Sequence, residues 1–473
     1  MYTARSIFSN GVALFGIRLF MPLSFFMVSV LIARLLGVHA FGVYATVFSW
    51  YVLFRILSNF GLDFFLLREV PRRPESSAVF LNHAFVLASL FSLVNVLLMN
   101  GVLWIAGYSE ETRWCGFLAS LALFPESLNR NVEACFTGLH KTWPVFFTVF
   151  ARESAKIAAA IVFMRVWHEL APVIAAVAVG NFTGLLANAV LVRREFGRGE
   201  FSADRELFAR MFGVSAWLAF IGGVNSLFLS MDVIVLSKVR GEAAVGHYNA
   251  AGKFLTVAFL FIDSAGTALF PVLSGLHRDS PERFRRLAET AMRWLMAGFI
   301  FFIAVSWCFA DVWVTLVFGP EFLPSAGLLR ILAWIVLFLG NSYFMGRMFF
   351  IANAQKYDFI SISAACAVNA VLCWAGAVRW GAAGTAAGAL ASTAFLFVCH
   401  AALFRAKVFP IRVWNVWGLP LAGGILFAAV FAGLSPWNRP AAFGAAACVY
   451  AAYLFFSGTV PRSFRCLAAE LAP

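Results

Sequence analysis

Apolar stretches of about 20 residues recur from one end of this sequence to the other, separated by short polar or basic breaks. A helix rises 1.5 Å per residue, so a run of this length matches a hydrocarbon core of roughly 30 Å. The 473 residues are 62% hydrophobic and only 12% charged, against roughly 25% charged residues in soluble domains. The sequence therefore predicts an all-α protein that crosses a membrane many times.

The apolar runs, read between their breaks, predict about fourteen transmembrane helices. The first run is far longer than the apolar part of a signal peptide, and we interpret it as a retained helix. The predicted ranges are 10–36, 41–62, 80–107, 115–139, 144–166, 171–192, 211–236, 246–270, 293–318, 327–351, 358–379, 382–404, 413–434 and 440–458. An even number of spans predicts that both termini lie on the same side.

Basic residues are divided unequally between the two predicted sides. If the N-terminus lies inside, 21 of the 36 lysine and arginine residues fall in inner segments and seven in outer ones. The positive-inside rule then places both termini in the cytoplasm and accounts for the net charge of +13. A nucleic-acid partner would need these charges on one folded face with aromatic side chains, and the sequence shows no such grouping.

Enzyme and metal motifs are absent from the sequence. The eight cysteines and seven histidines are scattered without metal-ligand spacing, and there is no nucleotide-binding loop or hydrolase motif. The connections between predicted spans are short and leave little room for a catalytic domain. We predict a protein that is not an enzyme and holds neither a metal nor a cofactor.

One short pattern occurs twice. Residues 37–44 (GVHAFGVY) and 241–248 (GEAAVGHY) share the pattern G-x4-G-x-Y, and each copy joins an outgoing predicted helix to a returning one. This predicts two parallel repeats of six helices, related by an axis along the membrane normal. We place the N-terminal lobe at residues 1–200, the C-terminal lobe at 201–405, and two additional helices with a cytoplasmic tail at 406–473.

Several segments, in order and spacing, resemble the polysaccharide-export flippases (O-antigen or exopolysaccharide, Wzx-type) of the multidrug/oligosaccharidyl-lipid/polysaccharide (MOP) exporter superfamily. These segments are 33–37 (ARLLG), 41–44 (FGVY), 227–232 (LFLSMD), 268–274 (ALFPVLS), 317–322 (VFGPEF), 328–332 (LLRIL) and 380–389 (WGAAGTAAGA). The resemblance spans roughly residues 5–405. It implies a MATE-like or MurJ-like fold of two six-helix lobes that works by alternating access.

The resemblance also implies a cargo and a location. The cargo would be an undecaprenyl-diphosphate-linked oligosaccharide, flipped from the cytoplasmic to the periplasmic leaflet of the bacterial inner membrane during lipopolysaccharide or exopolysaccharide biosynthesis. Implied partners, besides membrane lipids, are a polysaccharide polymerase and a chain-length regulator. Because no nucleotide-binding motif is present, the expected energy source is an H⁺ or Na⁺ gradient or the membrane potential.

Charged side chains inside predicted spans are costly, by roughly 2.5 to 3.5 kcal/mol each, so we expect them to face a cavity or one another. Arginine forks form charge-assisted bidentate bonds to phosphate oxygens. The predicted cationic cavity for the diphosphate consists of Arg18, Arg55, Arg130, Arg152, Lys156 and Lys253. Candidates for binding a coupling ion are Asp63, Glu126, Glu133, Glu153 and Asp263.

Some of these residues also fit structural roles. Glu126, Arg130 and Glu133 are spaced to lie on one helix face, where they can neutralise one another as a buried stripe. Arg330 and Arg347 lie near the ends of one predicted span and fit interface anchors.

Three other functions stay open. A lipid II-type flippase is the closest competitor, and only the details of the resemblance favour an oligosaccharide carrier over it. A multidrug or cation antiporter of the superfamily would need unpaired carboxylates in its cavity, whereas the predicted first lobe has five intramembrane cations against three carboxylates. A membrane-embedded glycan polymerase would need a larger loop or domain for its chemistry.

Overall fold

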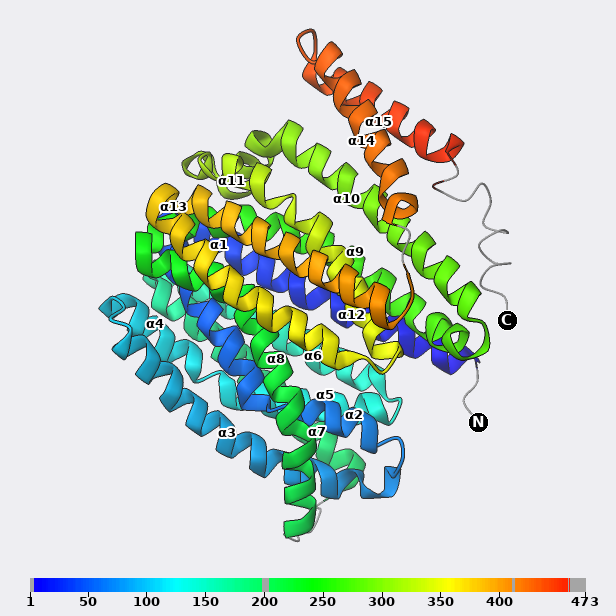
Figure 1. The fold of residues 1–473 in the computed structure, drawn as a ribbon. Helices are drawn as coiled ribbons and strands as arrows, with labels where there is room; N and C mark the ends of the chain where they lie inside the picture. Colours follow the sequence, from blue (N-terminus) through cyan, green and yellow to red (C-terminus); the bar gives the residue numbers. More distant parts are fainter. Residues whose placement is uncertain (1–3, 198–203, 411–412, 458, 460–473) are drawn as a thin grey trace. The chain divides into compact units, whose positions relative to one another are not determined.

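The computed structural model describes residues 4–197, 204–410, 413–457 and 459. Within these residues all regular structure is helical, which confirms the predicted fold class. The chain forms two compact units, Met1–Asn249 and Ala250–Pro473. Each unit is described separately below (Figure 1).

The first unit contains the helices that lie before the middle of the chain. They are α1 (Ala4–Asn59), α2 (Leu62–Glu69), η1 (Pro74–Ser76), α3 (Ser77–Ile105), α4 (Glu110–Ser120), α5 (Leu123–Gly138), α6 (Thr142–Trp167), α7 (Leu170–Phe196), α8 (Arg205–Arg240) and the beginning of α9 (Glu242–Asp279). Helix α1 covers the first two predicted spans, which meet at a kink where Gly37 has a φ of 78°. Helices α4 and α5 together cover the fourth predicted span.

Apolar side chains fill the interior of this unit and also cover its outer faces. Inside, Phe65 of α2 and Phe80 of α3 pack edge to face with ring centroids 5.8 Å apart, and Phe136 of α5 belongs to the same cluster. Outside, Leu97 and Ile105 of α3 are 68% and 80% exposed. A helix that is apolar on all sides suits a protein whose surroundings are lipid.

The two copies of the repeated pattern lie against each other. Gly37 and Gly241 have nearly the same left-handed backbone, with φ of 78° and 79°. A Cβ at Gly42 would come within 1.7 Å of the Glu242 carbonyl oxygen, and one at Gly246 within 2.2 Å of the Val38 carbonyl oxygen. The repeat therefore marks two equivalent bends whose backbones touch at positions where only glycine fits.

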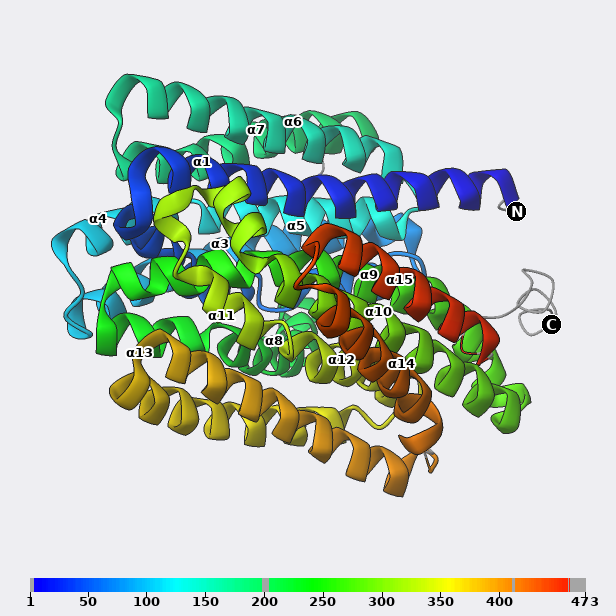
Figure 2. The same cartoon turned by 90° about the horizontal axis from the view of Figure 1, so that it is seen from above.

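The second unit contains the remaining helices. They are the rest of α9, α10 (Pro281–Phe318), η2 (Pro320–Phe322), α11 (Ser325–Leu332), α12 (Ile335–Ile351), α13 (Gln355–Lys407), α14 (Val413–Leu434) and α15 (Arg439–Phe456). Helix α13 folds back at Gly381, and its two arms run side by side (Figure 2). Gly376 and Gly384 face each other across the arms, where a Cβ on either would lie about 2 Å from the other's carbonyl oxygen.

Helices α14 and α15 form a pair that packs on α10 within the second unit (Figures 1 and 2). The Tyr450 hydroxyl donates a hydrogen bond of 3.0 Å to the Ala297 carbonyl of α10. Phe427 of α14 and Phe443 of α15 pack edge to face, with ring centroids 5.6 Å apart. These two helices are the additional pair predicted beyond residue 405.

Among the described residues, eight helices are long and apolar enough to cross a membrane, or up to ten if each bent pair is one span. Two of the eight, those bent at Gly37 and Gly381, each hold two predicted spans, so the count of fourteen is approximate. The division between the units falls inside α9, and α8 packs with the first unit. The lobe boundaries at residues 200 and 405 stay a prediction.

Candidate functional site

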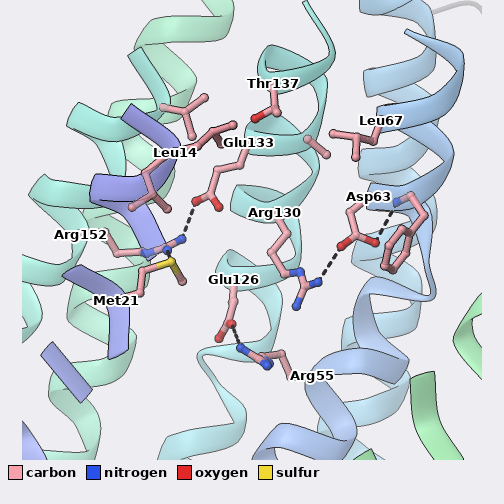
Figure 3. A pocket seen from close by; sticks show the side chains of 14 residues that line it. Leu14, Met21, Arg55, Asp63, Leu67, Glu126, Arg130, Glu133, Thr137 and Arg152 are labelled. Carbon is pink, nitrogen blue, oxygen red and sulfur yellow. Dashed lines mark hydrogen bonds and ion pairs between the residues drawn. The ribbon is translucent and has the colours of Figure 1, made fainter. Parts of the chain in front are cut away.

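A cavity of about 360 Å³ lies inside the first unit, lined by residues of α1, α2, α5 and α6 (Figure 3). Leu14, Ile17 and Met21 of α1 form part of its apolar wall. Its charged lining consists of Arg55, Arg130, Arg152, Asp63, Glu126 and Glu133. Five of these six charges lie on α1, α5 and α6, and Asp63 lies on the short helix α2.

Helix α5 carries three of these charges on one face, and each pairs with a different helix (Figure 3). Glu126 Oε1 lies 3.2 Å from Arg55 Nη1 of α1. Arg130 Nη2 lies 2.6 Å from Asp63 Oδ2 of α2. Figure 3 shows Arg55 and Asp63 reaching α5 from the same side.

The third pair lies on the other side of α5 and extends into α6. Arg152 Nη1 is 2.6 Å from Glu133 Oε1, and its Nε donates to Glu153 Oε1 at 3.1 Å. Glu153 also accepts hydrogen bonds from Ser24 at 2.8 Å and from Lys156. Arg152 is 5% exposed in its side chain, so this branch is almost completely closed to solvent.

Small residues on α7 make room for this branch. Helices α6 and α7 run side by side (Figure 2). A Cβ at Gly184 would come within 3.0 Å of the Arg152 Cδ, and one at Gly180 within 2.7 Å of the Lys156 Cβ. Glycine at these two positions therefore lets the long cationic side chains of α6 pass between the helices.

The predicted stripe on α5 has ion-pair partners on other helices. Glu126, Arg130 and Glu133 are close enough along the helix to interact, yet each has its ion-pair partner on another helix. The physical reason is that these side chains point across the cavity, where partners from α1, α2 and α6 can meet them head on. The pairs therefore connect helices instead of stabilising α5 alone.

The predicted excess of cations in this region needs correction. Asp63 follows a turn at Gly61, whose φ is 75°, and this turn brings α2 back toward Arg130. With Asp63 included and Arg18 outside the cavity lining, these ion pairs balance four cations with four carboxylates: Arg55, Arg130, Arg152 and Lys156 with Asp63, Glu126, Glu133 and Glu153. The sequence count left Asp63 out because it lies just past the second predicted span.

The remaining predicted site residues lie elsewhere. Arg18 is exposed and is not among the residues that line this cavity, although Leu14, Ile17 and Met21 of the same helix are. Lys253 belongs to the second unit, where it is buried. The second unit also holds Asp263, which forms an ion pair with Arg347 of α12.

Tyr51 is a functional candidate that sequence reasoning missed. Its hydroxyl donates a hydrogen bond to Glu126, beside the Arg55 ion pair. Tyr51 and Arg55 are four residues apart, so they lie on the same face of α1. This spacing was the available signal, because a hydroxyl and a guanidinium on one face can hold a single carboxylate.

The cavity is suited to exchanging one anion for another. The side chains of Arg55 and Arg130 remain 30% and 29% exposed, so an anion that enters can reach both guanidinium groups. Phosphate oxygens can accept bidentate bonds from guanidinium groups such as these two. In the part of the chain that the structure describes, no cluster of three or more His, Cys, Asp or Glu side chains suits a metal ion.

Comparison with known proteins gives one family and several related folds. The family described as polysaccharide biosynthesis protein matches residues 7–277, more than half of the chain. The structure of lipid II flippase MurJ in an inward closed conformation has a TM-score of 0.75 at 14% identity, covering 98% of this chain and 100% of that one. A search of curated proteins finds no match.

Two structures of MOP superfamily transporters cover a smaller part of this chain than the MurJ structure does. An inward-facing multidrug resistance MATE family transporter has a TM-score of 0.69 at 14% identity, covering 83% of this chain and 97% of that one. A MOP superfamily transporter from Pyrococcus furiosus has a TM-score of 0.57 at 14% identity, covering 83% and 95%. At these identities the likeness establishes the fold.

Proposed function

Since the chain belongs to the polysaccharide biosynthesis protein family and has the fold of MOP superfamily transporters, we propose that it is a flippase for lipid-linked oligosaccharide. The proposed cargo is an undecaprenyl-diphosphate-linked repeat unit of O-antigen or exopolysaccharide. It moves from the cytoplasmic to the periplasmic leaflet of the bacterial inner membrane, by alternating access. We propose transport as the activity, with no chemical conversion of the cargo.

The observation that carries this proposal is the pair of exposed arginines in a cavity among apolar helices. A diphosphate must leave water to cross the membrane, and losing its hydration is costly unless other donors replace it. Arg55 and Arg130 supply such donors, and both lie in the part of the chain that the family match covers. In the proposed cycle the diphosphate takes the place of Glu126 and Asp63 as their partner.

This exchange suggests how an ion gradient would drive transport. When an arginine turns to the diphosphate, its former carboxylate is left without a cation inside a protein cavity. Binding of H⁺ or Na⁺ by that carboxylate would restore the charge balance. Among the predicted coupling residues, Glu126 and Asp63 are the best placed, because their partners Arg55 and Arg130 are the two exposed cations.

A lipid II-type cargo is the second candidate, and the coverage of the fold comparisons favours it over a multidrug antiporter. The MurJ structure covers 98% of this chain, whereas the MATE structure covers 83%. Lipid II and the proposed cargo share the diphosphate that the arginines would bind. We propose that both termini lie in the cytoplasm, as the positive-inside rule predicts, and that lipid-linked cargo enters from that side. A polymerase and a chain-length regulator would act after the flippase.

Cells that lack this protein should lose surface polysaccharide and accumulate its undecaprenyl-diphosphate-linked repeat unit. The reason is that synthesis continues on the cytoplasmic leaflet while the step that delivers the unit outward is missing. Lipid extracts analysed by mass spectrometry would measure the accumulated intermediate, with a strain that carries the gene on a plasmid as the control. Normal surface glycan together with raised sensitivity to cationic drugs would favour the antiporter instead.

A further inference from the structure

Three arginines meet at one buried carboxylate outside the cavity, at the end of α2. Arg72 Nη1 donates to Glu69 Oε1 at 3.2 Å, and Arg210 Nη2 of α8 donates to Glu69 Oε2 at 3.0 Å. Arg68 Nε lies 3.6 Å from Glu69 Oε1. Within the described residues, Glu69 is the carboxylate that lies within ion-pair distance of all three guanidinium groups. We call these four residues the surface arginine cluster.

The local fold at the end of α2 brings these side chains together. The helix ends at Glu69, whose carbonyl accepts hydrogen bonds from the backbone N–H groups of Arg72 and Arg73 at 3.1 and 3.0 Å. This tight turn holds Arg72 next to the carboxylate that lies three residues before it. Helix α8 packs against α2 and supplies Arg210. Two separate elements of the first unit therefore direct their arginines to the same point.

The carboxylate of this cluster is closed to solvent, whereas its guanidinium groups are open. The side chain of Glu69 is 8% exposed, and those of Arg68, Arg72 and Arg210 are 61%, 59% and 47% exposed. A guanidinium has five N–H donors, and Glu69 accepts one hydrogen bond from Arg72 and one from Arg210. The buried carboxylate therefore holds the three groups in one place while most of their donors stay available to an anion.

The ion pairs of this cluster leave an excess of positive charge, which the cavity lacks. Three arginines share one glutamate here, whereas the cavity is lined by three arginines and three carboxylates. The Asp204 carboxylate at the beginning of α8 accepts hydrogen bonds from two backbone N–H groups of that helix. Other charged residues of the two segments are exposed and are not in ion-pair contact with Glu69: Arg73, Glu75, Arg205 and Glu206. At hydrogen-bond distance, an anion therefore meets uncompensated cations at this cluster.

The surface arginine cluster is next to the cavity along the same helix. Asp63 and Leu67 of α2 line the cavity (Figure 3), and Arg68 follows Leu67 directly. The six residues from Asp63 to Glu69 correspond to about 9 Å along the helix axis. The three arginines of the cluster all lie in segments that the positive-inside rule assigns to the cytoplasmic side. The cluster is therefore on the side from which we propose that cargo enters.

We propose that the surface arginine cluster is a second diphosphate site, which captures the cargo from the cytoplasmic leaflet before it enters the cavity. This inference rests on the proposed flippase function. The diphosphate between the undecaprenyl chain and the glycan carries one negative charge on each phosphate, which equals the excess of two cations in the cluster. A phosphatidylglycerol headgroup carries a single charge, so charge complementarity favours the diphosphate. From this cluster the diphosphate would move along α2 to Arg130, the partner of Asp63.

A capture site should affect how efficiently cargo is collected and leave the later steps unchanged. Arg68→Gln with Arg72→Gln removes the excess charge and keeps the ion pair of Glu69 with Arg210, so the contact between α2 and α8 stays. In proteoliposomes of low ionic strength, we expect this double variant to flip cargo about tenfold more slowly at low cargo concentration, the lower end of electrostatic steering. The rate at saturating cargo should stay the same.

The matched control is Arg278→Gln with Arg283→Gln, which removes two exposed arginines of the second unit and should leave both rates unchanged. In 1 M NaCl, where the Debye length is about 3 Å, the difference between the Arg68→Gln, Arg72→Gln variant and the unmodified protein should disappear. A difference that persists at this salt concentration, or that appears in the rate at saturating cargo, would show a structural role for the cluster and contradict capture.

Binding is measured separately, in the Arg55→Ala protein, in which we expect no transport. The probe is radiolabelled undecaprenyl diphosphate, added to full-length protein in phosphatidylcholine nanodiscs. Adding Arg68→Gln and Arg72→Gln should weaken its binding by about tenfold or more, because charge-assisted hydrogen bonds are lost. Adding Arg278→Gln and Arg283→Gln should not.

Equal binding by all these proteins would overturn the proposal. Displacement of the probe by a tenfold excess of phosphatidylglycerol would also overturn it, because the cluster would then be a general site for anionic lipid. If the unmodified protein does not flip cargo but the Arg68→Gln, Arg72→Gln substitutions still weaken binding of the probe, the flippase function is contradicted and the diphosphate site is retained.

Discussion

Replacing Arg55 with alanine should abolish glycan export while the protein stays folded and abundant. Arg55 is 30% exposed in the cavity, and its guanidinium is one of the two that can reach a diphosphate. Loss of a hydrogen-bonded charge from such a contact costs about 2 kcal/mol or more, which corresponds to a decrease of about 30-fold or more in rate. Surface polysaccharide, measured against the amount of protein in the membrane, checks this result.

A second substitution separates binding of cargo from structural pairing. Arg55→Ala leaves Glu126 without its cation, so the loss could come from that carboxylate alone. The double variant Arg55→Ala with Glu126→Gln restores the charge balance without restoring the guanidinium. We expect the double variant to stay inactive. Glu126→Gln alone should keep more export activity than Arg55→Ala or the double variant. Recovery of export in the double variant would mean that Arg55 serves only to neutralise Glu126. Arg330→Ala with Asp311→Asn removes an ion pair outside the cavity and serves as the control.

Arg152→Met should destabilise the protein more than any other single change in the cluster. Arg152 is 5% exposed and holds both Glu133 and Glu153. Removing it leaves two carboxylates in a nearly closed space with Lys156 as their remaining cation, and breaking a buried pair in this way costs about 3–5 kcal/mol. Thermal unfolding of the purified protein in detergent, followed by the loss of soluble monomer, measures the effect.

The variant that also carries Glu133→Gln and Glu153→Gln should recover most of this stability, because it no longer buries unpaired charge. The control is Arg286→Met, which breaks a surface ion pair with Glu282 and should change the free energy of unfolding by no more than about 0.5 kcal/mol. If Arg152→Met unfolded at the same temperature as the unmodified protein, the ion pairs of Arg152 with Glu133 and Glu153 would not stabilise the protein.

Hydropathy was enough to predict the helices, and it failed where the chain changes direction over a few residues. The apolar runs identify α1 and α13 correctly, and Gly37 and Gly381 mark where each bends. The short helix α2 was missed because Asp63 and Arg68 interrupt the apolar pattern there. Its absence from the prediction is the reason why Asp63 was left out of the charge count.

Side-chain direction could not be predicted on helices that are apolar on all sides. In α1, Ile17 and Met21 line the cavity while Arg18 is exposed, and the sequence has no polar face that would have shown this. The partners of Glu126 and Arg130 depend on how α1, α2 and α5 pack against one another. The residues next to these two charges in the sequence do not determine that packing. Residue types and depth therefore predicted most of the cluster, and tertiary packing determined its pairs.

The most direct measurement of flippase activity uses proteoliposomes that contain undecaprenyl-diphosphate oligosaccharide in both leaflets. A glycan-cleaving enzyme added outside reports which molecules are accessible. We expect complete, protein-dependent cleavage with the unmodified protein, and cleavage limited to the outer-leaflet fraction with Arg55→Ala. Cleavage that stops at the outer-leaflet fraction with correctly inserted unmodified protein and an imposed ion gradient would contradict flipping of this cargo.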